Sequence, residues 1–238
     1  MRVSGFMTAV ITFGIALLLS TYVLAQPKIY VHYSVKVKPG MRGAFEDLII
    51  NEGLPLFKGY STMVGYWKTL MGDFNEMICI WLYDNVTKFE QRVKDSENNS
   101  AFHRFARERN TLVTDDYGEM LQLPEWANAP ELPIKWHIVI HETHIVKHGN
   151  MQPYLEYWRT TALAGLKEAG FRIVGPFIQH SGDSDEMLIL ICFENLAERD
   201  AKLAAFGNFA IAETFPVMTD KYLEGFHIKI LAPSKINR

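Results

Sequence analysis

Cysteine is scarce in this chain: only Cys79 and Cys192 occur among its 238 residues. Small exported domains that depend on disulfides carry a longer, even series of cysteines, so a disulfide framework is excluded. The two cysteines also fall on corresponding segments of a repeat described below, at positions of opposite parity. On equivalent strands their side chains would point to opposite faces, and we therefore expect two free thiols.

An excess of charge of either sign is also missing. There are 24 Lys and Arg residues against 27 Asp and Glu, which gives a formal net charge of -3. This balance provides no basic surface for binding nucleic acid, and no basic tract indicates binding to an anionic membrane. The nucleophile elbow, the phosphate-binding glycine loop and the dinucleotide fingerprint are missing as well. Hydrophobic residues nevertheless make up 48% of the chain, which is typical of a folded protein.

The first 25 residues have the pattern of a signal peptide. Arg2 is the only charge before an apolar run from Val3 to Leu24, and Val23 and Ala25 stand where a signal peptidase reads small residues. This pattern predicts cleavage after Ala25 and an extracytoplasmic protein, either secreted or periplasmic. The run is also long enough to span a bilayer. An uncleaved anchor is therefore the alternative, and membrane contact is expected only in that case.

The two halves of the remaining chain repeat each other. The segment Asn75–Asn85 recurs as Asp185–Asn195, and Val64–Trp67 corresponds to Val174–Phe177. Such self-similarity decides the architecture before any single motif does. A proline-rich stretch without hydrophobic period separates the halves and predicts a linker. We therefore expect a signal peptide or anchor at 1–25, a first repeat at 26–123, a linker at 124–135, a second repeat at 136–232 and a tail at 233–238.

Each half reads strand, helix, strand, strand, helix, strand. This order is that of the ferredoxin-like split unit, a sheet with helices on one face only. The bare apolar faces of two such sheets can cover each other. The predicted fold class is α+β, with two ferredoxin-like βαββαβ repeats forming one intramolecular barrel. In this arrangement the helices lie outside, and the space between the sheets is the expected ligand cavity.

Strand alternation sorts the residues that would face this cavity. Along 75–83, one face carries polar and aromatic side chains, whereas Ile78, Ile80 and Leu82 form the other. The aliphatic face is the natural seat for helices, so the first set is predicted to point into the barrel. The second repeat has mostly apolar residues at the matching positions, which predicts a pocket with one polar side. The predicted ligand-binding residues are Trp67, Asn75, Cys79, Trp81, Tyr83 and Phe177.

Several of these segments resemble one known family. The motifs Lys38-Pro-Gly, Leu54-Pro55, Val64-Gly-Tyr-Trp67 and the stretch from Gly72 to Asp84 are similar to the NIPSNAP domain family. The resemblance covers most of residues 30–123 and is weaker in the second repeat, where 185–195 carries it. It implies a dimeric α+β barrel, a group that includes cofactor-free monooxygenases, polyketide cyclases, haem-degrading enzymes and chlorite dismutases.

The chain departs from the family pattern inside the expected cavity. Cys79 stands where the family tends to have a histidine, and Val31 and Tyr33 replace a Glu-x-Arg pair. The same pattern implies that Tyr33, Glu142 and His144 face inward. Glu142 and His144 would lie about 7 Å apart along their strand, and a carboxylate beside an imidazole suits acid–base catalysis. We predict these three residues as catalytic candidates, against the alternative that they are packed or surface residues.

Metal or haem binding is a weaker prediction. His137 and His141 would lie about 13 Å apart on one strand, too far to share an ion. A metal would therefore need a histidine from another strand, such as His180 or His227. Haem ligation by one inward histidine is similarly weak, so no cofactor is predicted.

The sequence is compatible with two functions. One is an enzyme of the monooxygenase, isomerase or cyclase type that acts without a cofactor on a hydrophobic small molecule, with Glu142 or His144 moving protons. The other is a non-catalytic binding or scaffold protein outside the cytoplasm. Neither the ligand nor the formation of a homo-oligomer follows from the sequence.

Overall fold

A computed structural model describes residues 27–127, 129–179 and 185–237. The predicted signal peptide or anchor and His180 lie outside these residues. Among the described helices, none has the length and apolar character needed to cross a membrane.

The first repeat has the predicted order of elements. It contains β1 (Ile29–Val37), α2 (Arg42–Leu48), the π-helical turn η1 (Ile49–Gly53), α3 (Leu54–Phe57), β2 (Thr62–Met71), β3 (Glu76–Tyr83), α4 (Val86–Asn98), α5 (Ser100–Leu112) and β4 (Val113–Gln122). Pro55 lies in the first turn of α3, directly after the π-helical turn, and the helical run that begins at Arg42 continues past it to Phe57.

The second repeat has the same order. It contains β5 (Ile138–Val146), α6 (Met151–Tyr157), the π-helical turn η2 (Trp158–Ala162), α7 (Leu163–Glu168), β6 (Arg172–Gln179), β7 (Glu186–Phe193), α8 (Leu196–Ala205), η3 (Phe206–Asn208), α9 (Ile211–Tyr222), β8 (Leu223–Pro233) and η4 (Lys235–Asn237). Asn85 and Asn195 cap the equivalent helices α4 and α8, and each accepts a hydrogen bond from the N–H three residues on. These matching elements and caps fix the correspondence of residues between the repeats.

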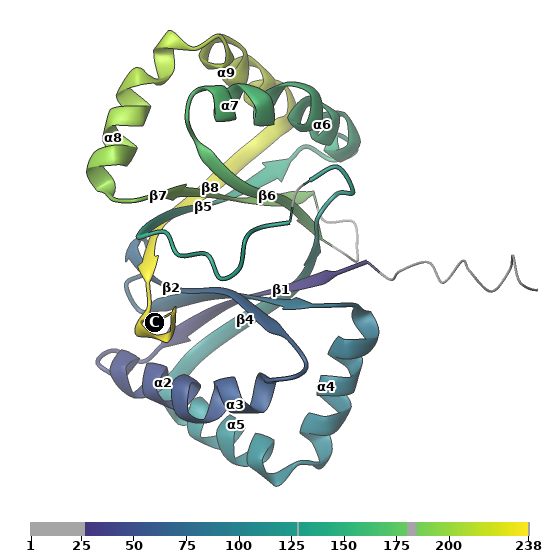
Figure 1. Ribbon diagram of the computed structural model, residues 1–238, viewed down its shortest axis with the longest axis vertical. Helices are drawn as coiled ribbons and strands as arrows, with labels where there is room; N and C mark the ends of the chain where they lie inside the picture. The colour runs from purple at the N-terminus through teal and green to yellow at the C-terminus, as the bar shows by residue number, and fades with distance from the viewer. Residues whose placement is uncertain (1–26, 128, 180–184, 238) are drawn as a thin grey trace, which may run out of the picture.

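The eight strands close into one antiparallel barrel in the order β1-β3-β2-β8-β5-β7-β6-β4. Each repeat contributes a four-stranded sheet, and the helices of each repeat lie on the outside of its own sheet (Figure 1). One seam between the repeats joins β2 to β8, and the other joins β4 to β6, where the described residues pair Leu121 with Gln179 and Gln122 with Ile178. The predicted α+β barrel of two ferredoxin-like repeats is confirmed.

Side chains of both repeats fill the inside of the barrel. Tyr30, Trp67, Phe177 and Leu231 are buried there together with aliphatic residues of β3 and β7. A small barrel is usually packed in this way. The prediction that the ligand cavity lies between the sheets is therefore wrong.

The two faces of β3 are the reverse of the prediction. Ile78 and Ile80 point into the barrel, whereas Cys79, Trp81 and Tyr83 pack against the helices of the first repeat. All eight residues of β3 are buried. Because the barrel covers one face and the helices the other, alternation of polarity carries no information on direction here.

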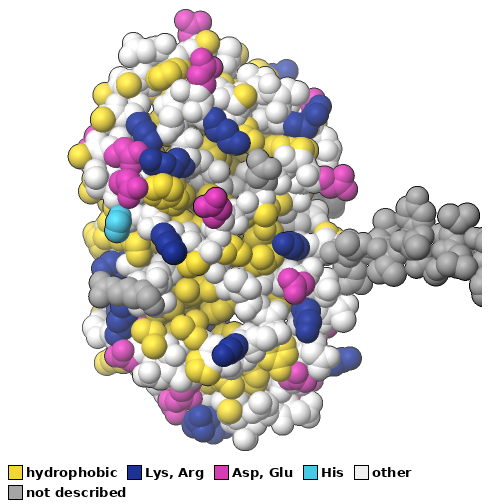
Figure 2. Space-filling model, viewed as in Figure 1, with side chains coloured by type: hydrophobic (Ala, Val, Ile, Leu, Met, Phe, Trp, Pro, Cys, Tyr) yellow, Lys and Arg dark blue, Asp and Glu magenta, His cyan; other side chains and the backbone are white. Residues whose placement is uncertain are grey.

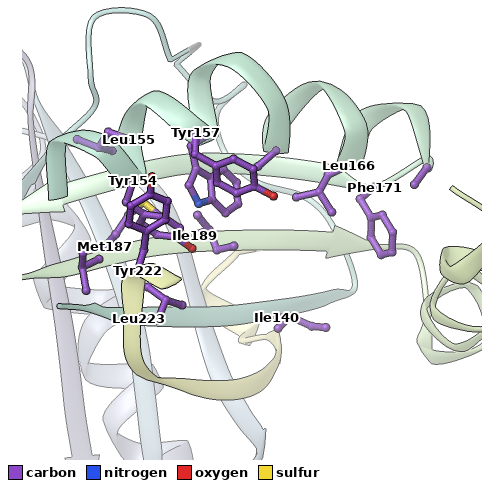
Figure 3. Packing of buried hydrophobic residues seen from close by; sticks show 14 of the residues in the cluster. Ile140, Tyr154, Leu155, Tyr157, Leu166, Phe171, Met187, Ile189, Tyr222 and Leu223 are labelled. Carbon is purple, nitrogen blue, oxygen red and sulfur yellow. The ribbon is translucent and has the colours of Figure 1, made fainter. Parts of the chain in front are cut away.

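A separate core lies between the helices and the sheet of each repeat. In the second repeat, Tyr154, Tyr157 and Leu166 reach from α6 and α7 toward Met187 and Ile189 (Figure 3). The outer surface carries scattered charges of both signs (Figure 2), in keeping with the charge balance. Cys79 and Cys192 are free and buried on opposite sides of the sheet, as predicted.

Candidate functional site

A cavity of about 240 Å³ lies between the sheet and the helices of the first repeat. Its wall comes from β1, β2, β3 and β4 of the sheet and from η1, α3, α4 and α5 of the helical layer. The lining is mostly aromatic or aliphatic, with two arginines and one aspartate. The residues are Tyr33, Val35, Ile49, Phe57, Tyr66, Cys79, Trp81, Tyr83, Arg92, Phe105, Arg109 and Asp116.

The local structure explains how these side chains meet. Tyr33 and Cys79 are directly paired across β1 and β3, so they stand side by side on the face that the helices cover. Residues two apart on β3 share that face, which adds Trp81 and Tyr83. The π-helical turn inserts one extra residue into the helix, and Ile49 opens that turn. Phe57 packs on Trp81 with ring centroids 5.1 Å apart.

Arg92 is the main polar feature of the cavity. Its Nη2 donates to the Tyr33 hydroxyl at 3.1 Å, and its Nε to the Tyr83 hydroxyl at 3.4 Å. The guanidinium also lies 5.3 Å from the Phe57 ring centroid and 5.7 Å from that of Phe89. Among the described residues, Arg92 thus contacts two phenol hydroxyls and two aromatic rings, and none of these groups carries a negative charge.

The second arginine is neutralised. Arg109 Nη2 donates to Asp116 Oδ2 at 2.6 Å. Burial raises the pKa of the Cys79 thiol to about 12, and burial also raises the pKa of Tyr33, although Arg92 opposes this shift. Both groups therefore stay protonated near neutral pH. The cavity presents hydrogen-bond donors and a cation rather than a nucleophile.

Glu142 and His144 lie together, but in the second repeat. His144 Nε2 is 3.2 Å from Glu142 Oε1, and His144 Nδ1 is 2.7 Å from the Tyr154 hydroxyl. His144 is 1% exposed and packs near Trp158, with ring centroids 5.9 Å apart. The prediction that Tyr33, Glu142 and His144 face the barrel interior is wrong, because all three face the helices of their own repeats. The residues that do face inward are their neighbours His32 and His141.

His32 and His141 meet inside the barrel. They hold equivalent positions on β1 and β5, and their Nε2 atoms are 3.1 Å apart. His32 Nδ1 lies 2.8 Å from Glu119 Oε1. Burial lowers the pKa of His141 well below its ordinary value, and the charges of His32 and Lys229 add to this effect. In the described residues, no group of three or more His, Cys, Asp or Glu side chains is placed to hold a metal ion.

The predicted ligand-binding residues separate into three groups. Cys79, Trp81 and Tyr83 line the cavity together with Tyr33. Trp67 and Phe177 are part of the barrel interior and are 0% exposed. Asn75 is exposed in the turn between β2 and β3, where its N–H donates to Asp73.

The other lining residues of the cavity were not predicted as site residues. They are Val35, Ile49, Phe57, Tyr66, Arg92, Phe105, Arg109 and Asp116. One signal was present in the sequence. Arg109 lies on the same helical face as Phe105, and Arg92 follows Phe89 by one helical turn. An arginine on the apolar face of an amphipathic helix is a candidate for a buried role.

Comparisons with known proteins agree with the duplicated fold. The family model described as NIPSNAP matches residues 32–128 and 142–233. A "putative monooxygenase" from Fusobacterium nucleatum subsp. nucleatum is similar with a TM-score of 0.67 at 12% identity, covering 88% of this chain and 94% of its own. A second protein of that description, from Lactobacillus acidophilus, has a TM-score of 0.59 at 13% identity and covers 87% and 94%. At these identities the likeness shows the fold alone, and no curated protein matches the chain at a significant level.

Proposed function

This chain belongs to the NIPSNAP family, and we propose that its first repeat binds a hydrophobic small molecule in the cavity between helices and sheet. The observation that carries the proposal is the cavity lining, in which aromatic and aliphatic side chains surround a small polar corner. Ligand sites commonly have this composition. The volume of about 240 Å³ lies below the range of about 300–1,000 Å³ that is common for larger ligands. A ligand of one or two rings fits this size.

The polar groups of the cavity favour binding over covalent chemistry. Tyr33 and Cys79 are held in their protonated forms by burial, so neither is a base or a nucleophile near neutral pH. Tyr33 is thereby suited to donate a hydrogen bond. In a catalytic use of this cavity, Tyr33 would donate a hydrogen bond to an oxygen atom of the substrate.

The test is to fill the cavity with a large side chain, as Trp158 fills the equivalent region of the second repeat. Trp158 opens η2 where Ile49 opens η1, so Ile49→Trp copies the second repeat into the first. Isothermal titration calorimetry with the neutral two-ring probe 2-naphthamide should show binding to the native protein. Ile49→Trp should weaken that binding at least about tenfold, equivalent to about 1.4 kcal/mol.

The matched control is Ile228→Trp, which makes the same change at a side chain that is 49% exposed. It should bind the probe like the native protein. Circular dichroism confirms that both variants are folded. Native-like binding by a folded Ile49→Trp variant would place the probe elsewhere and contradict the proposal, as would a native protein that binds neither this amide nor the corresponding acid, 2-naphthoate.

A second candidate function is acid–base catalysis in the second repeat. The observation that favours it is the chain of contacts from Glu142 through His144 to the Tyr154 hydroxyl, because a carboxylate orients an imidazole in this way in many catalytic sites. Burial raises the pKa of Tyr154, so its hydroxyl stays protonated near neutral pH and can donate a hydrogen bond to His144.

This candidate is tested with a Glu142→Gln, His144→Asn variant. Turnover of a compound that co-purifies with the protein should disappear if the pair is catalytic. Binding of 2-naphthamide in the first repeat should not change in the same variant. Unaltered turnover by the folded variant removes the pair from consideration.

A further inference from the structure

The polar corner of the cavity holds an uncompensated positive charge. Arg92 stays charged at any physiological pH, and it is partly withdrawn from solvent beneath Phe57 and Phe89. Its two hydrogen-bond acceptors in the described chain are the neutral hydroxyls of Tyr33 and Tyr83. A charge removed from water is costly unless an opposite charge compensates it. An anion bound at this corner would supply the missing counter-charge.

The hydroxyls themselves point to the same conclusion. Because each phenol oxygen accepts a hydrogen bond from Arg92, its own O–H proton remains to be donated, and in the described residues neither hydroxyl donates to a protein acceptor. Arg92, Tyr33 and Tyr83 thus converge as three donors. A carboxylate, which offers two oxygens and accepts only, satisfies such a set.

The neighbouring charges restrict the anion to this corner. Arg109 is already paired with Asp116 at 2.6 Å, so only one cation of the cavity lacks a counter-charge. A group with a single negative charge matches that balance better than a doubly charged phosphate. The rest of the wall, including Trp81, Phe105 and Ile49, is apolar and suits the ring or branched chain that carries the carboxylate.

The second repeat shows what a compensated version looks like. Lys202 holds the position of Arg92, seven residues after the capping asparagine of its helix. It forms an ion pair with Glu198 at 2.8 Å. At the position of Tyr83 stands Phe193, which has no hydroxyl. The donor set and the missing counter-charge are thus specific to the repeat that has the cavity.

We propose that the cavity of the first repeat selects small aromatic or branched-chain carboxylic acids, with Arg92, Tyr33 and Tyr83 binding the carboxylate. This assignment rests on the binding function proposed above. It adds the class of ligand and three specificity-determining residues.

The test compares 2-naphthoate with 2-naphthamide, two probes of the same shape that differ in charge, by isothermal titration calorimetry. The native protein should bind 2-naphthoate more tightly than the amide. Arg92→Met should weaken binding of 2-naphthoate by about 10- to 100-fold, the value of a charge-assisted hydrogen bond. Binding of 2-naphthamide should stay within about twofold of the native value, because the apolar wall is unchanged.

Two further variants keep the outcome decisive. Arg104→Met removes an arginine of α5 that is 57% exposed and pairs with Glu52 outside the cavity, and it should leave both affinities unchanged. If Arg92→Met does not fold, the milder Tyr33→Phe, Tyr83→Phe double variant should still reduce the preference for 2-naphthoate.

The outcomes separate the two proposals. Equal binding of both probes to the native protein, or a preference for 2-naphthoate that survives in folded Arg92→Met, overturns the carboxylate assignment and leaves the binding function standing. An equal loss in Arg92→Met and Arg104→Met also overturns it, since the effect would then be one of net charge. If neither probe binds, the binding function fails and the assignment fails with it.

Discussion

The two repeats share a fold and differ in what occupies the space between helices and sheet. In the first repeat, Val35 and Ile49 border an open cavity. At the equivalent positions the second repeat has His144 and Trp158, which pack on each other and are buried. In the second repeat, larger side chains thus occupy the region that corresponds to the cavity of the first repeat. The comparison teaches that the same arrangement of helices and sheet can be filled by packing in one copy and left open in the other.

The difference extends to charge. Lys202 of the second repeat is paired with Glu198, whereas Arg92 of the first repeat contacts only phenols and rings in the described chain. The cation of the filled repeat thus has a counter-charge among the described residues, and the cation at the equivalent position of the open repeat does not.

The largest expected effect is on stability when the filled repeat is emptied. Trp158→Ala removes a side chain that is 0% exposed and should lower the free energy of unfolding by about 3–5 kcal/mol. Ile49→Ala in the first repeat should cost no more than about 2 kcal/mol, at the lower end of such changes, because its side chain already borders open space. Urea unfolding of both variants measures the difference. Equal losses would show that the two regions are packed alike.

A smaller loss of stability is expected when the Tyr154 hydroxyl is removed. This hydroxyl has no counterpart at the equivalent position of the first repeat. Tyr154 bonds buried His144 at 2.7 Å, whereas the equivalent residue of the first repeat is Phe45. Tyr154→Phe leaves the histidine nitrogen without its partner and should cost about 1–3 kcal/mol. Tyr117→Phe, at a side chain that is 56% exposed, is the control and should change stability by less than about 0.5 kcal/mol. If Tyr154→Phe leaves the free energy of unfolding unchanged, the hydrogen bond to His144 makes no net contribution to stability.

The pH dependence of stability tests the two equivalent histidines where the repeats meet. The folded-state pKa of His141 lies well below its ordinary value of 6.5 because of burial and the charges of His32 and Lys229. As the pH falls below about 6.5, the unfolded chain takes up a proton at this residue and the folded protein does not, so stability falls. Burial alone would raise the pKa of Glu119, but its contacts with His32 and Gln179 lower it below 4.5. The stability contribution of Glu119 is therefore lost only at lower pH.

His141→Gln should flatten the stability profile between pH 6.5 and 5, measured by urea unfolding at each pH. His137→Gln, at a side chain that is 74% exposed, provides the control and should keep the native slope. If the two variants have the same slope, the buried pair does not control the acid sensitivity of the barrel.

The sequence was sufficient for the architecture because the repeat and the periodicity act over short distances. The strands and helices of each repeat occur in the predicted order, and the barrel follows from two half-covered sheets. The face of β3 on which the site lies was not predictable in the same way. Since β3 is buried on both faces, Cys79 and Ile80 look equally internal, and the aromatic face was assigned to the wrong side.

The residues that complete the cavity come from distant parts of the chain. Arg92 on α4 meets Tyr33 on β1, 59 positions away. No local pattern of sequence encodes that contact, although an arginine on an apolar helix face was a usable signal. Glu142 and His144 were correctly expected to be close, but the element that covers them is a helix with Trp158 and not the barrel interior.

The most direct test of the central contrast is a crystal structure of the native protein soaked with 2-naphthoate. We expect one molecule in the first repeat, with its ring beside Trp81 and its carboxylate at Arg92, and no density for the probe beside Trp158. Probe density between the two sheets or in the second repeat would contradict the contrast between an open and a filled repeat.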